Sequence, residues 1–381
     1  MSSLADLLLL GSERDLSSER GVSCTGELPE ASDPSLVARA QAARSALRDR
    51  AMVLGHHYQR DEVIAFADIT GDSFKLAQSA AENRAAELII FCGVHFMAES
   101  ADILTSDQQR VILPDLAAGC SMADMATATQ VNDAWKVMTE LGISSKTIPV
   151  TYMNSSAAIK SFTGENGGTI CTSSNAERAM RWAFDHGEKV FFLPDQHLGR
   201  NTAVLKLGLN LEDCGVWNPW KPRGGLSDDQ IRSAKVILWR GHCSVHGRFS
   251  VENIAEVRTR VPGINVLVHP ECQHDVVKGA DVVGSTEMII KTVAAAPAGS
   301  AWAVGTELNL VKRLAAMNPD KKVIFLDKTV CYCSTMNRID LPHLVWAMET
   351  LAEGKIINQI TVPPTTAHFA RVALERMLAL P

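Results

Sequence analysis

One pattern occurs three times along the chain of 381 residues, and it constrains the fold more than any other feature. In each copy, a short apolar run rich in β-branched residues begins with a basic residue and is followed a few residues later by the dipeptide Cys-Ser. Such runs are typical of buried strands in parallel sheets. The runs and dipeptides are Arg110–Leu113 with Cys120-Ser121, Lys235–Leu238 with Cys243-Ser244, and Lys322–Phe325 with Cys333-Ser334.

The sequence before each of these runs repeats as well. A strand-like run ends in a polar or aromatic residue, a helix-like stretch follows, and a short turn with Ser or Thr comes next. His56 lies 17 positions before Ser73, and His269 lies 17 positions before Thr286. A third strand-like run completes each copy. The first runs are Ala51–Leu54, Thr147–Val150 and Asn265–Val268, the turns are Gly71–Ser73, Cys171–Ser173 and Gly284–Thr286, and the third runs are Leu88–Phe91, Val190–Leu193 and Ala301–Val304.

The repeat predicts an α/β fold with three similar domains, each a four-stranded parallel sheet flanked by helices. Ligands of open parallel sheets bind outside the carboxyl ends of the strands. If the domains face one another with pseudo-threefold symmetry, the three Cys-Ser dipeptides meet around a central cluster. This convergence favours metal ligands over buried core residues for Cys120, Cys243 and Cys333.

The expected domains span residues 35–125, 126–246 and 247–339. Residues 1–34 are rich in Ser, Glu, Asp and Gly, and we expect a loosely attached or disordered N-terminal arm there. Residues 210–230, rich in Pro, Gly and Trp, are interpreted as a surface insertion in the second domain. Residues 340–381 contain two amphipathic stretches, Leu344–Glu353 and Thr366–Leu380, which should form helices that pack back on the domains.

Composition argues against several classes of protein. A net charge of −6 argues against a general nucleic-acid surface. No apolar run reaches the ~20 residues that a membrane helix needs, and Leu7–Leu10 is too short for a signal peptide. We therefore expect a cytoplasmic protein. The nine cysteines are an odd number, so core residues, metal ligands or catalytic groups are expected rather than disulfides.

Three thiolates can bind zinc, with water as the fourth ligand, or a [4Fe–4S] cluster with one iron left open. Zinc sites usually include a local CxxC pair, and ferredoxin clusters use local runs of cysteines. The only close pair here is the CxC of Cys331 and Cys333. Spacings of 123 positions from Cys120 to Cys243 and of 90 from Cys243 to Cys333 instead suit a cluster at a domain junction, whose open iron acts as a Lewis acid.

In these residues the chain resembles the quinolinate synthase family. The resemblance extends over about residues 36–345 in consistent order, and it rests on a series of spaced motifs. The motifs are GHHYQRDEVIAFADITGDSF (55–74), GCSMADM (119–125), TYMNSSAAIK (151–160), CTSSNA (171–176), FFLPDQHLG (191–199), GHCSVHGRF (241–249), HPEC (269–272), GST (284–286), GTELNLVKRL (305–314) and CxxM at Cys333–Met336.

The resemblance implies three similar α/β domains around a [4Fe–4S] cluster held by Cys120, Cys243 and Cys333. It implies a transferase that condenses iminoaspartate with dihydroxyacetone phosphate, loses phosphate and water, and closes the ring of quinolinate in de novo NAD biosynthesis. An aspartate oxidase or dehydrogenase would then be a functional partner. The matching substrate-binding and catalytic residues are His56, Ser73, Tyr152, Met153, Asn154, Ser173, His269, Pro270, Glu271 and Thr286.

The chemistry of these residues suggests roles for several of them. Glu271, with His269 nearby, is assigned as general acid and base or as a reversible ligand of the open iron, and Tyr152 as its partner. His269 and Glu271 both face the pocket if an extended chain continues between them. Asn154 and His56 are expected to orient the substrate carboxylates.

Ser73, Ser173 and Thr286 lie in turns before helix-like stretches, a position typical of ordinary helix caps and of anion sites. Their recurrence favours binding of the anionic substrates. Two features depart from the family pattern. His57 stands where the family often has Asn, and it is not expected to be essential. A CxC replaces the CxxCxxC run of some members, so a regulatory disulfide involving Cys331 is not expected.

Two other functions stay open at this point. A dehydratase of the aconitase kind would also use three cysteines, although normally with a CxxC pair. A non-enzymatic iron–sulfur sensor would need the cysteines and no catalytic residues. His242 and His246 are interpreted as structural hydrogen-bonding groups, and Met122 and Met336 as packing around the cavity.

Overall fold

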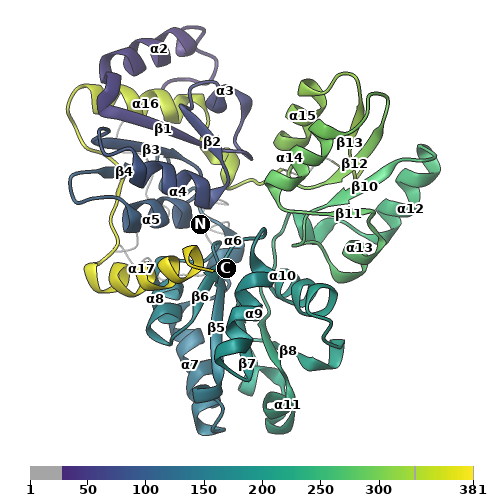
Figure 1. Cartoon of the computed structure of the whole chain (residues 1–381). Coiled ribbons are helices and arrows are strands. Elements are labelled where there is room, and N and C mark those ends of the chain that lie inside the picture. Colours follow the sequence, from purple (N-terminus) through teal and green to yellow (C-terminus); the bar gives the residue numbers. More distant parts are fainter. Residues whose placement is uncertain (1–27, 330–331, 381) are drawn as a thin grey trace, which may run out of the picture.

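The computed structural model describes residues 28–329 and 332–380 and arranges their strands in three separate sheets (Figure 1). All strand pairings in these sheets are parallel except one. Helices flank each sheet, so the predicted α/β class is confirmed. Most of the predicted N-terminal arm lies outside the described residues, and the first described helix begins at Leu36.

The first sheet has the strand order β14-β4-β3-β1-β2. The apolar runs form strands because their side chains are buried on both faces, as in the fully buried β3. One strand was not predicted: β14 pairs antiparallel with β4 and adds a fifth strand. The strands are β1 (Ala51–His56), β2 (Ile69–Gly71), β3 (Leu88–Cys92), β4 (Arg110–Ile112) and β14 (Gln359–Ile360), and the helices are α2 (Leu36–Leu47), α3 (Asp61–Ile64), α4 (Ser73–Glu82) and α5 (His95–Leu104).

The second sheet has the order β6-β5-β7-β9-β8. Interpreting residues 210–230 as a surface insertion is wrong in part, because this segment contains β8, which pairs with β9 at the sheet edge. Trp217 of β8 is buried, so this part of the segment belongs to the core. The strands are β5 (Thr147–Tyr152), β6 (Thr169–Cys171), β7 (Lys189–Leu193), β8 (Cys214–Trp217) and β9 (Val236–Trp239), and the helices are α6 (Ser121–Asp124), α7 (Ala128–Glu140), α8 (Ala157–Glu165), α9 (Ala176–His186), α10 (Gln196–Asn201) and α11 (Asp228–Ser233).

The third sheet has the order β11-β10-β12-β13. Its first helix, α12, begins with a capping box, in which Ser250 and Asn253 each accept a backbone N–H of the other. The strands are β10 (Asn265–Val268), β11 (Val282–Val283), β12 (Ala301–Gly305) and β13 (Lys322–Phe325), and the helices are α12 (Val251–Arg260), α13 (His274–Gly279), α14 (Thr286–Ala295) and α15 (Leu308–Met317).

The strand order repeats among the three sheets. In each, the first strand along the chain lies between the second and the third, and β4, β9 or β13 lies beyond the third. In the second sheet, β8 precedes β9 along the chain and pairs outside it at the edge. This order places the loops after the first strands, β1, β5 and β10, in the interior of each carboxyl edge. Figure 1 shows the three sheets around a common centre near α6.

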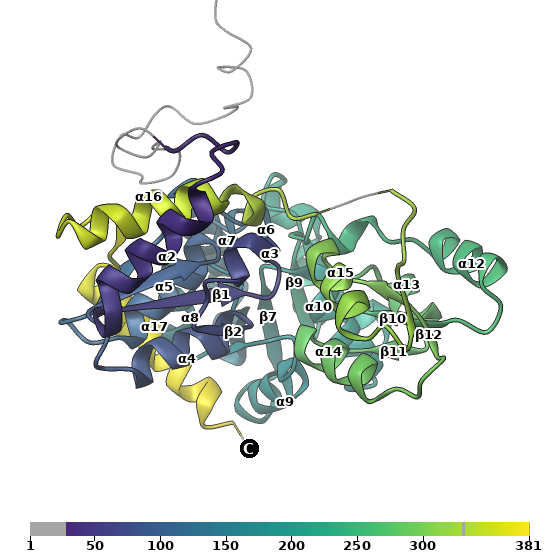
Figure 2. The same cartoon turned by 90° about the horizontal axis from the view of Figure 1, so that it is seen from above.

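The two predicted C-terminal helices are present as α16 (Leu341–Ala352) and α17 (Pro364–Leu378). They pack back on the first two sheets, with α16 beside α2 and α17 beside α8 (Figure 2). The largest apolar core joins side chains of these two sheets and both C-terminal helices. Within residues 28–329 and 332–380, no helix combines the length and the apolar character that crossing a bilayer requires.

Candidate active site

The loops that follow strands of all three sheets line one pocket. Every residue predicted to bind substrate or metal lines it except Pro270, which lines a neighbouring cavity. Met122 and Met336 also line it and are buried, as expected of packing residues. The side chain of His57 lies instead 3.8 Å from Glu287. The predicted residues in the pocket are His56, Ser73, Cys120, Tyr152, Met153, Asn154, Ser173, Cys243, His269, Glu271, Thr286 and Cys333.

The three cysteines reach the pocket from similar local structures. Each lies just before a short helical turn: Cys120 precedes α6, and Cys243 and Cys333 precede the 3₁₀ turns His246–Arg248 and Met336–Arg338. In each case a backbone N–H three positions further along donates to the sulfur. Such N–H groups favour a sulfur that carries negative charge.

The three thiols share one partly buried environment, the lining of this pocket. Burial raises the pKa of all three thiols, to about 12 for Cys120. They also lie close enough together for electrostatic interaction: the charge of Cys333 raises the pKa of Cys120, and both raise the pKa of Cys243. Three partly buried thiols with N–H donors form a donor set that suits a soft metal group rather than a hard cation.

Residues 269–272 form a β-turn, not the extended chain that we expected. Cys272 N–H donates to His269 O at 3.0 Å, and Pro270 occupies the second position, where its fixed φ suits a turn. The N–H of Glu271 also points to His269 Nδ1, at 3.4 Å. Both side chains therefore line the pocket as predicted, but because the chain turns between them.

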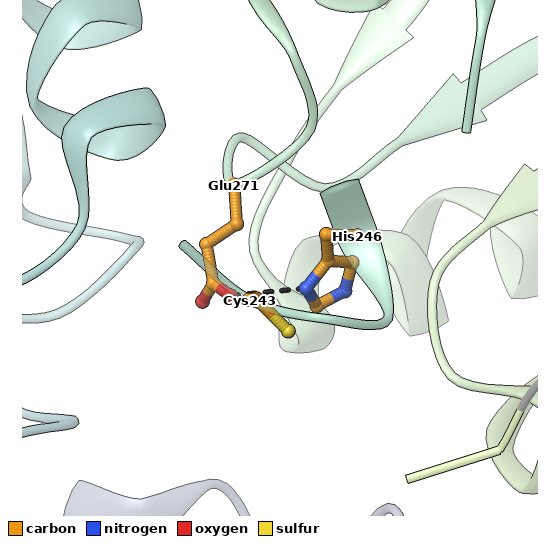
Figure 3. A group of neighbouring side chains, drawn as sticks. All are labelled: Cys243, His246 and Glu271. Carbon is orange, nitrogen blue, oxygen red and sulfur yellow. Dashed lines mark hydrogen bonds and ion pairs between the residues drawn. The ribbon is translucent and has the colours of Figure 1, made fainter. Parts of the chain in front are cut away.

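Glu271 lies between Tyr152 and His246. Tyr152 Oη donates to Glu271 Oε1 at 2.6 Å, and His246 Nδ1 lies 3.0 Å from Oε2 (Figure 3). The His246 ring stacks on that of His269, with 4.4 Å between centroids. Burial alone would raise the pKa of Glu271, but the two imidazoles and the hydrogen bonds from His246 and Tyr152 outweigh burial and hold it below its usual range.

The neighbours of Glu271 are held in complementary protonation states. Burial, with the added effect of His246, lowers the pKa of His269 to about 3. Burial and the nearby Glu271 raise the pKa of Tyr152 well above its usual range. At neutral pH the site therefore combines a neutral imidazole, a protonated phenol and an ionised carboxylate in direct contact. Such a set can give and take protons.

A chain of hydrogen bonds extends from Glu271 to Tyr58. His246 Nε2 lies 3.1 Å from Thr306 Oγ1, which lies 2.9 Å from Tyr58 Oη. Tyr58 Oη in turn lies 3.0 Å from Thr286 Oγ1. In the tautomer with the proton on Nδ1, His246 donates to the Glu271 carboxylate and accepts the hydroxyl proton of Thr306 at Nε2. The chain joins side chains from turns of the first, second and third sheets.

The Ser and Thr residues of the turns are not themselves the helix caps. Ser73 and Thr286 are the first residues of α4 and α14, while the caps are Asp72 and Ser285, whose side chains accept backbone N–H groups of the first turn. Neither hydroxyl of Ser73 or Thr286 is therefore the cap, and that of Thr286 lies 3.0 Å from Tyr58 Oη in the pocket. Ser173 lies three positions before α9 and also lines the pocket.

Three residues of the site had no predicted role. His246 was interpreted as a structural group, although its position three residues after Cys243 places it on the same turn. Tyr58 lies two positions after His56 in a turn, as Glu271 does after His269. Thr306 directly follows β12 at the carboxyl edge of its sheet. Its position directly after a strand is the sequence feature that could have indicated a role for Thr306 in the site.

Another donor set lies within the pocket. Cys243 Sγ, an imidazole nitrogen of His246 and a carboxylate oxygen of Glu271 all lie within 4.8 Å of one another (Figure 3). Sulfur, nitrogen and oxygen ligands in this number can hold a transition-metal ion. The spacing of these three ligand atoms is compatible with a bound metal ion.

Comparison with known proteins agrees with the site. A family model described as "Quinolinate synthetase A protein" matches residues 40–379. A quinolinate synthase of Streptomyces coelicolor is 69% identical over 377 residues, which cover 98% of this chain and 96% of the relative. One of Nocardioides is 66% identical over 381 residues, covering 98% and 97%, and one of Corynebacterium glutamicum is 54% identical over 354 residues, covering 93% and 90%. The chain therefore belongs to the quinolinate synthase family.

Proposed function

We propose that this protein condenses iminoaspartate with dihydroxyacetone phosphate and releases quinolinate, phosphate and water, as a transferase of NAD biosynthesis. The observation that carries the proposal is the contact of Tyr152 and His246 with the two oxygens of Glu271 in a pocket that three cysteines line. Membership of the family supports the same reaction. Because iminoaspartate is unstable, an aspartate oxidase or dehydrogenase would supply it.

Cys120, Cys243 and Cys333 would hold a [4Fe–4S] cluster. The fit rests on three partly buried thiols in one pocket, each with a backbone N–H donor, contributed by chain segments far apart in the sequence. With three protein ligands, the bound cluster supplies an open iron as a Lewis acid. In the proposed arrangement, the three sheets are related by a pseudo-threefold axis through this cluster.

The substrates are anions, and several pocket groups suit anions. The hydroxyls of Ser73 and Thr286 stand at the N-termini of α4 and α14, where the backbone N–H groups and the helix dipole favour negative charge. Asn154 and Ser173 add polar groups from the second sheet. We assign these residues to binding of the carboxylates and the phosphate, with Met153 shaping the wall and Pro270 setting the turn that carries Glu271.

His56 would orient a carboxylate from the first sheet. Its Nδ1 accepts the N–H of Tyr58 at 3.1 Å, so its neutral form carries the proton on Nε2. Burial, together with His57 and Arg313, lowers its pKa well below the usual range. The residue therefore acts as a neutral donor rather than as a charge.

Glu271 and Tyr152 would move the protons. The ionised carboxylate can take a proton from a carbon or nitrogen of the substrate, and the phenol can donate one to a leaving oxygen. His246 holds the second oxygen of Glu271 and restrains its rotation. Loss of water and ring closure both need such transfers, and the buried site keeps bulk water from competing with them.

The alternatives are an iron–sulfur sensor and a dehydratase, and one experiment distinguishes the proposed synthase from both. Anaerobically purified protein is incubated with iminoaspartate and dihydroxyacetone phosphate, and quinolinate is measured by chromatography. The proposal predicts brown protein with about four irons per chain and quinolinate that accumulates over many turnovers. Protein that is colourless, carries zinc and is active would contradict the cluster, and iron-loaded protein without product would contradict the reaction.

A further inference from the structure

The turn that carries Glu271 is held from the neighbouring sheet. Asn201, at the end of α10 beside the second sheet, donates through Nδ2 to the carbonyl oxygens of Pro270 and Cys272, both at 2.9 Å. Its Oδ1 lies 2.8 Å from His274 Nδ1, which fixes the orientation of the amide. Asn201 is 3% exposed, so water is poorly placed to replace it. One amide thus binds the carbonyls on both sides of Glu271.

The turn that carries Tyr58 is held in the same way from the third sheet. Arg313 of α15 donates through one guanidinium nitrogen to Gln59 O at 2.8 Å and through the other to His57 O. Asn309 of the same helix donates to Tyr58 O at 3.1 Å. The carbonyls on both sides of Tyr58 therefore bind one side chain of a neighbouring unit.

The two arrangements match position by position. Each turn is closed by a bond from the fourth residue's N–H to the first residue's oxygen, Cys272 to His269 at 3.0 Å and Gln59 to His56 at 2.9 Å. In both turns, the bound carbonyls belong to the second and fourth residues. Asn201 lies eight positions after the end of β7 (193 to 201), and Arg313 lies eight positions after the end of β12 (305 to 313).

The same position of the first sheet is occupied by Ser100, eight positions after the end of β3 (92 to 100). Its hydroxyl donates to Phe96 O of its own helix at 2.7 Å and lies 3.8 Å from Met153 Sδ in the turn after β5. The geometric relation between units is the same, but a serine cannot reach two carbonyls. Only two of the three turns are held by a strong donor at this position.

We propose that Asn201 and Arg313 are equivalent positioning residues, each of which fixes a catalytic turn of the next unit. This proposal rests on the proposed function, because only that function makes the residues carried by the two turns catalytic. The two turns deliver Glu271 and Tyr58 to opposite ends of one hydrogen-bond chain, so an error in either displaces groups that must meet. A displacement of about 1 Å can cost on the order of 10²-fold in rate.

The test uses the full-length protein with its cluster and measures two quantities. Asn201→Asp keeps the size and Oδ1 but loses both donors, and Arg313→Lys keeps the charge but loses the fork. We expect kcat to fall by about 10- to 100-fold while KM stays within about threefold. Hydrogen–deuterium exchange should rise at the amides of Glu271 and Cys272 in the first variant, and at those of Tyr58 and Gln59 in the second.

Matched controls separate positioning from general stability. Asn318 is a buried asparagine whose Nδ2 donates to Leu314 O within its own helix at 2.8 Å, away from any turn of the site. Asn318→Ala should lower the melting temperature and leave kcat and the exchange of both turns unchanged. Asp61→Asn removes the ion pair of Arg313 but keeps its carbonyl bonds, and should leave kcat unchanged.

Exchange distinguishes failure of this inference from failure of the proposed function. If the wild-type protein forms no quinolinate, the proposed function is wrong. Hydrogen–deuterium exchange at the turn amides still tests whether Asn201 and Arg313 hold the two turns. If Asn201→Asp and Arg313→Lys leave turn exchange and kcat at wild-type levels, or lower only the melting temperature as Asn318→Ala does, the inference is overturned. Because the variants act on different turns, one that fails to fold leaves the other as the test.

Discussion

Tyr152 Oη lies 2.6 Å from Glu271 Oε1, although the two residues are 119 positions apart and belong to different sheets: Tyr152 ends β5, and Glu271 lies in the turn after β10. A phenol on a buried carboxylate at this distance is a short, charge-assisted hydrogen bond. Neither sheet contains both groups, so the pair exists only where the second and third sheets meet. The chemistry that we propose for the pocket depends on this contact.

Removing the phenol oxygen should disable proton transfer without emptying the site. We expect Tyr152→Phe to lower kcat by about 10²- to 10⁴-fold, since positioned acid–base groups contribute rates of this order. The iron content and visible spectrum should match the wild type. Tyr332→Phe is the control because that tyrosine is half exposed and at the surface. A fully active Tyr152→Phe would remove Tyr152 from the mechanism.

The hydrogen-bond chain to Tyr58 can be cut at its middle member. Thr306→Val keeps the shape of the side chain but breaks the bridge between His246 and Tyr58. We expect kcat to fall by about tenfold, equivalent to about 1.4 kcal/mol of transition-state stabilisation. Thr350→Val, in which the lost bond goes to the carbonyl of Trp346 in the same helix, α16, should have wild-type kcat. Equal effects of the two substitutions on kcat would argue against a catalytic role for the hydrogen-bond chain from Glu271 to Tyr58.

The cluster assignment predicts which cysteines bind iron. Cys120→Ser, Cys243→Ser and Cys333→Ser should each lose most of the iron and the visible absorbance after anaerobic reconstitution. Cys92→Ser should retain both, because Cys92 is buried at the end of β3 and lies outside the pocket lining. Iron and sulfide analysis of the four variants checks this. Full iron in any of the three pocket variants would contradict the ligand set.

One histidine outside the catalytic contacts should make stability depend on pH. Burial, with Arg200 and His242, lowers the pKa of His197 to about 4, from the 6.5 of a free imidazole. Between these values the unfolded chain binds more protons, so stability should fall as pH decreases from about 6.5 toward 4. His197→Gln should reduce this slope in melting curves, and substitution of the exposed His368 should not. An unchanged slope in His197→Gln would assign the acid sensitivity to other groups.

The sheets could be predicted from the sequence because their signal is local. Every run from Ala51–Leu54 to Lys322–Phe325 that we identified as a strand is one, since β-branched side chains buried on both faces leave a clear pattern. The edge strands β8 and β14 were missed for the opposite reason. β14 has two residues, and β8 is embedded in a segment rich in Gly and Trp, so neither has a recognisable period.

The residues that line the pocket could largely be predicted, but the contacts among them could not. Repetition of strand ends identified all but three of the polar groups that we discuss in the pocket. That Tyr152 touches Glu271, or that Asn201 holds the turn of Glu271, depends on how the sheets pack against one another. A single sequence contains no local signal for such contacts. The turn at Pro270 illustrates the limit, because the chain reverses where we expected extension.

The most direct test of the account is quinolinate formation by wild type and Glu271→Gln, compared at equal iron content per chain. The amide keeps the size of the side chain but cannot take a proton. We predict steady quinolinate formation by the wild type from iminoaspartate and dihydroxyacetone phosphate, and a loss of about 10²-fold or more in Glu271→Gln. Equal product from both proteins at equal iron content, or none from the wild type, would contradict the account.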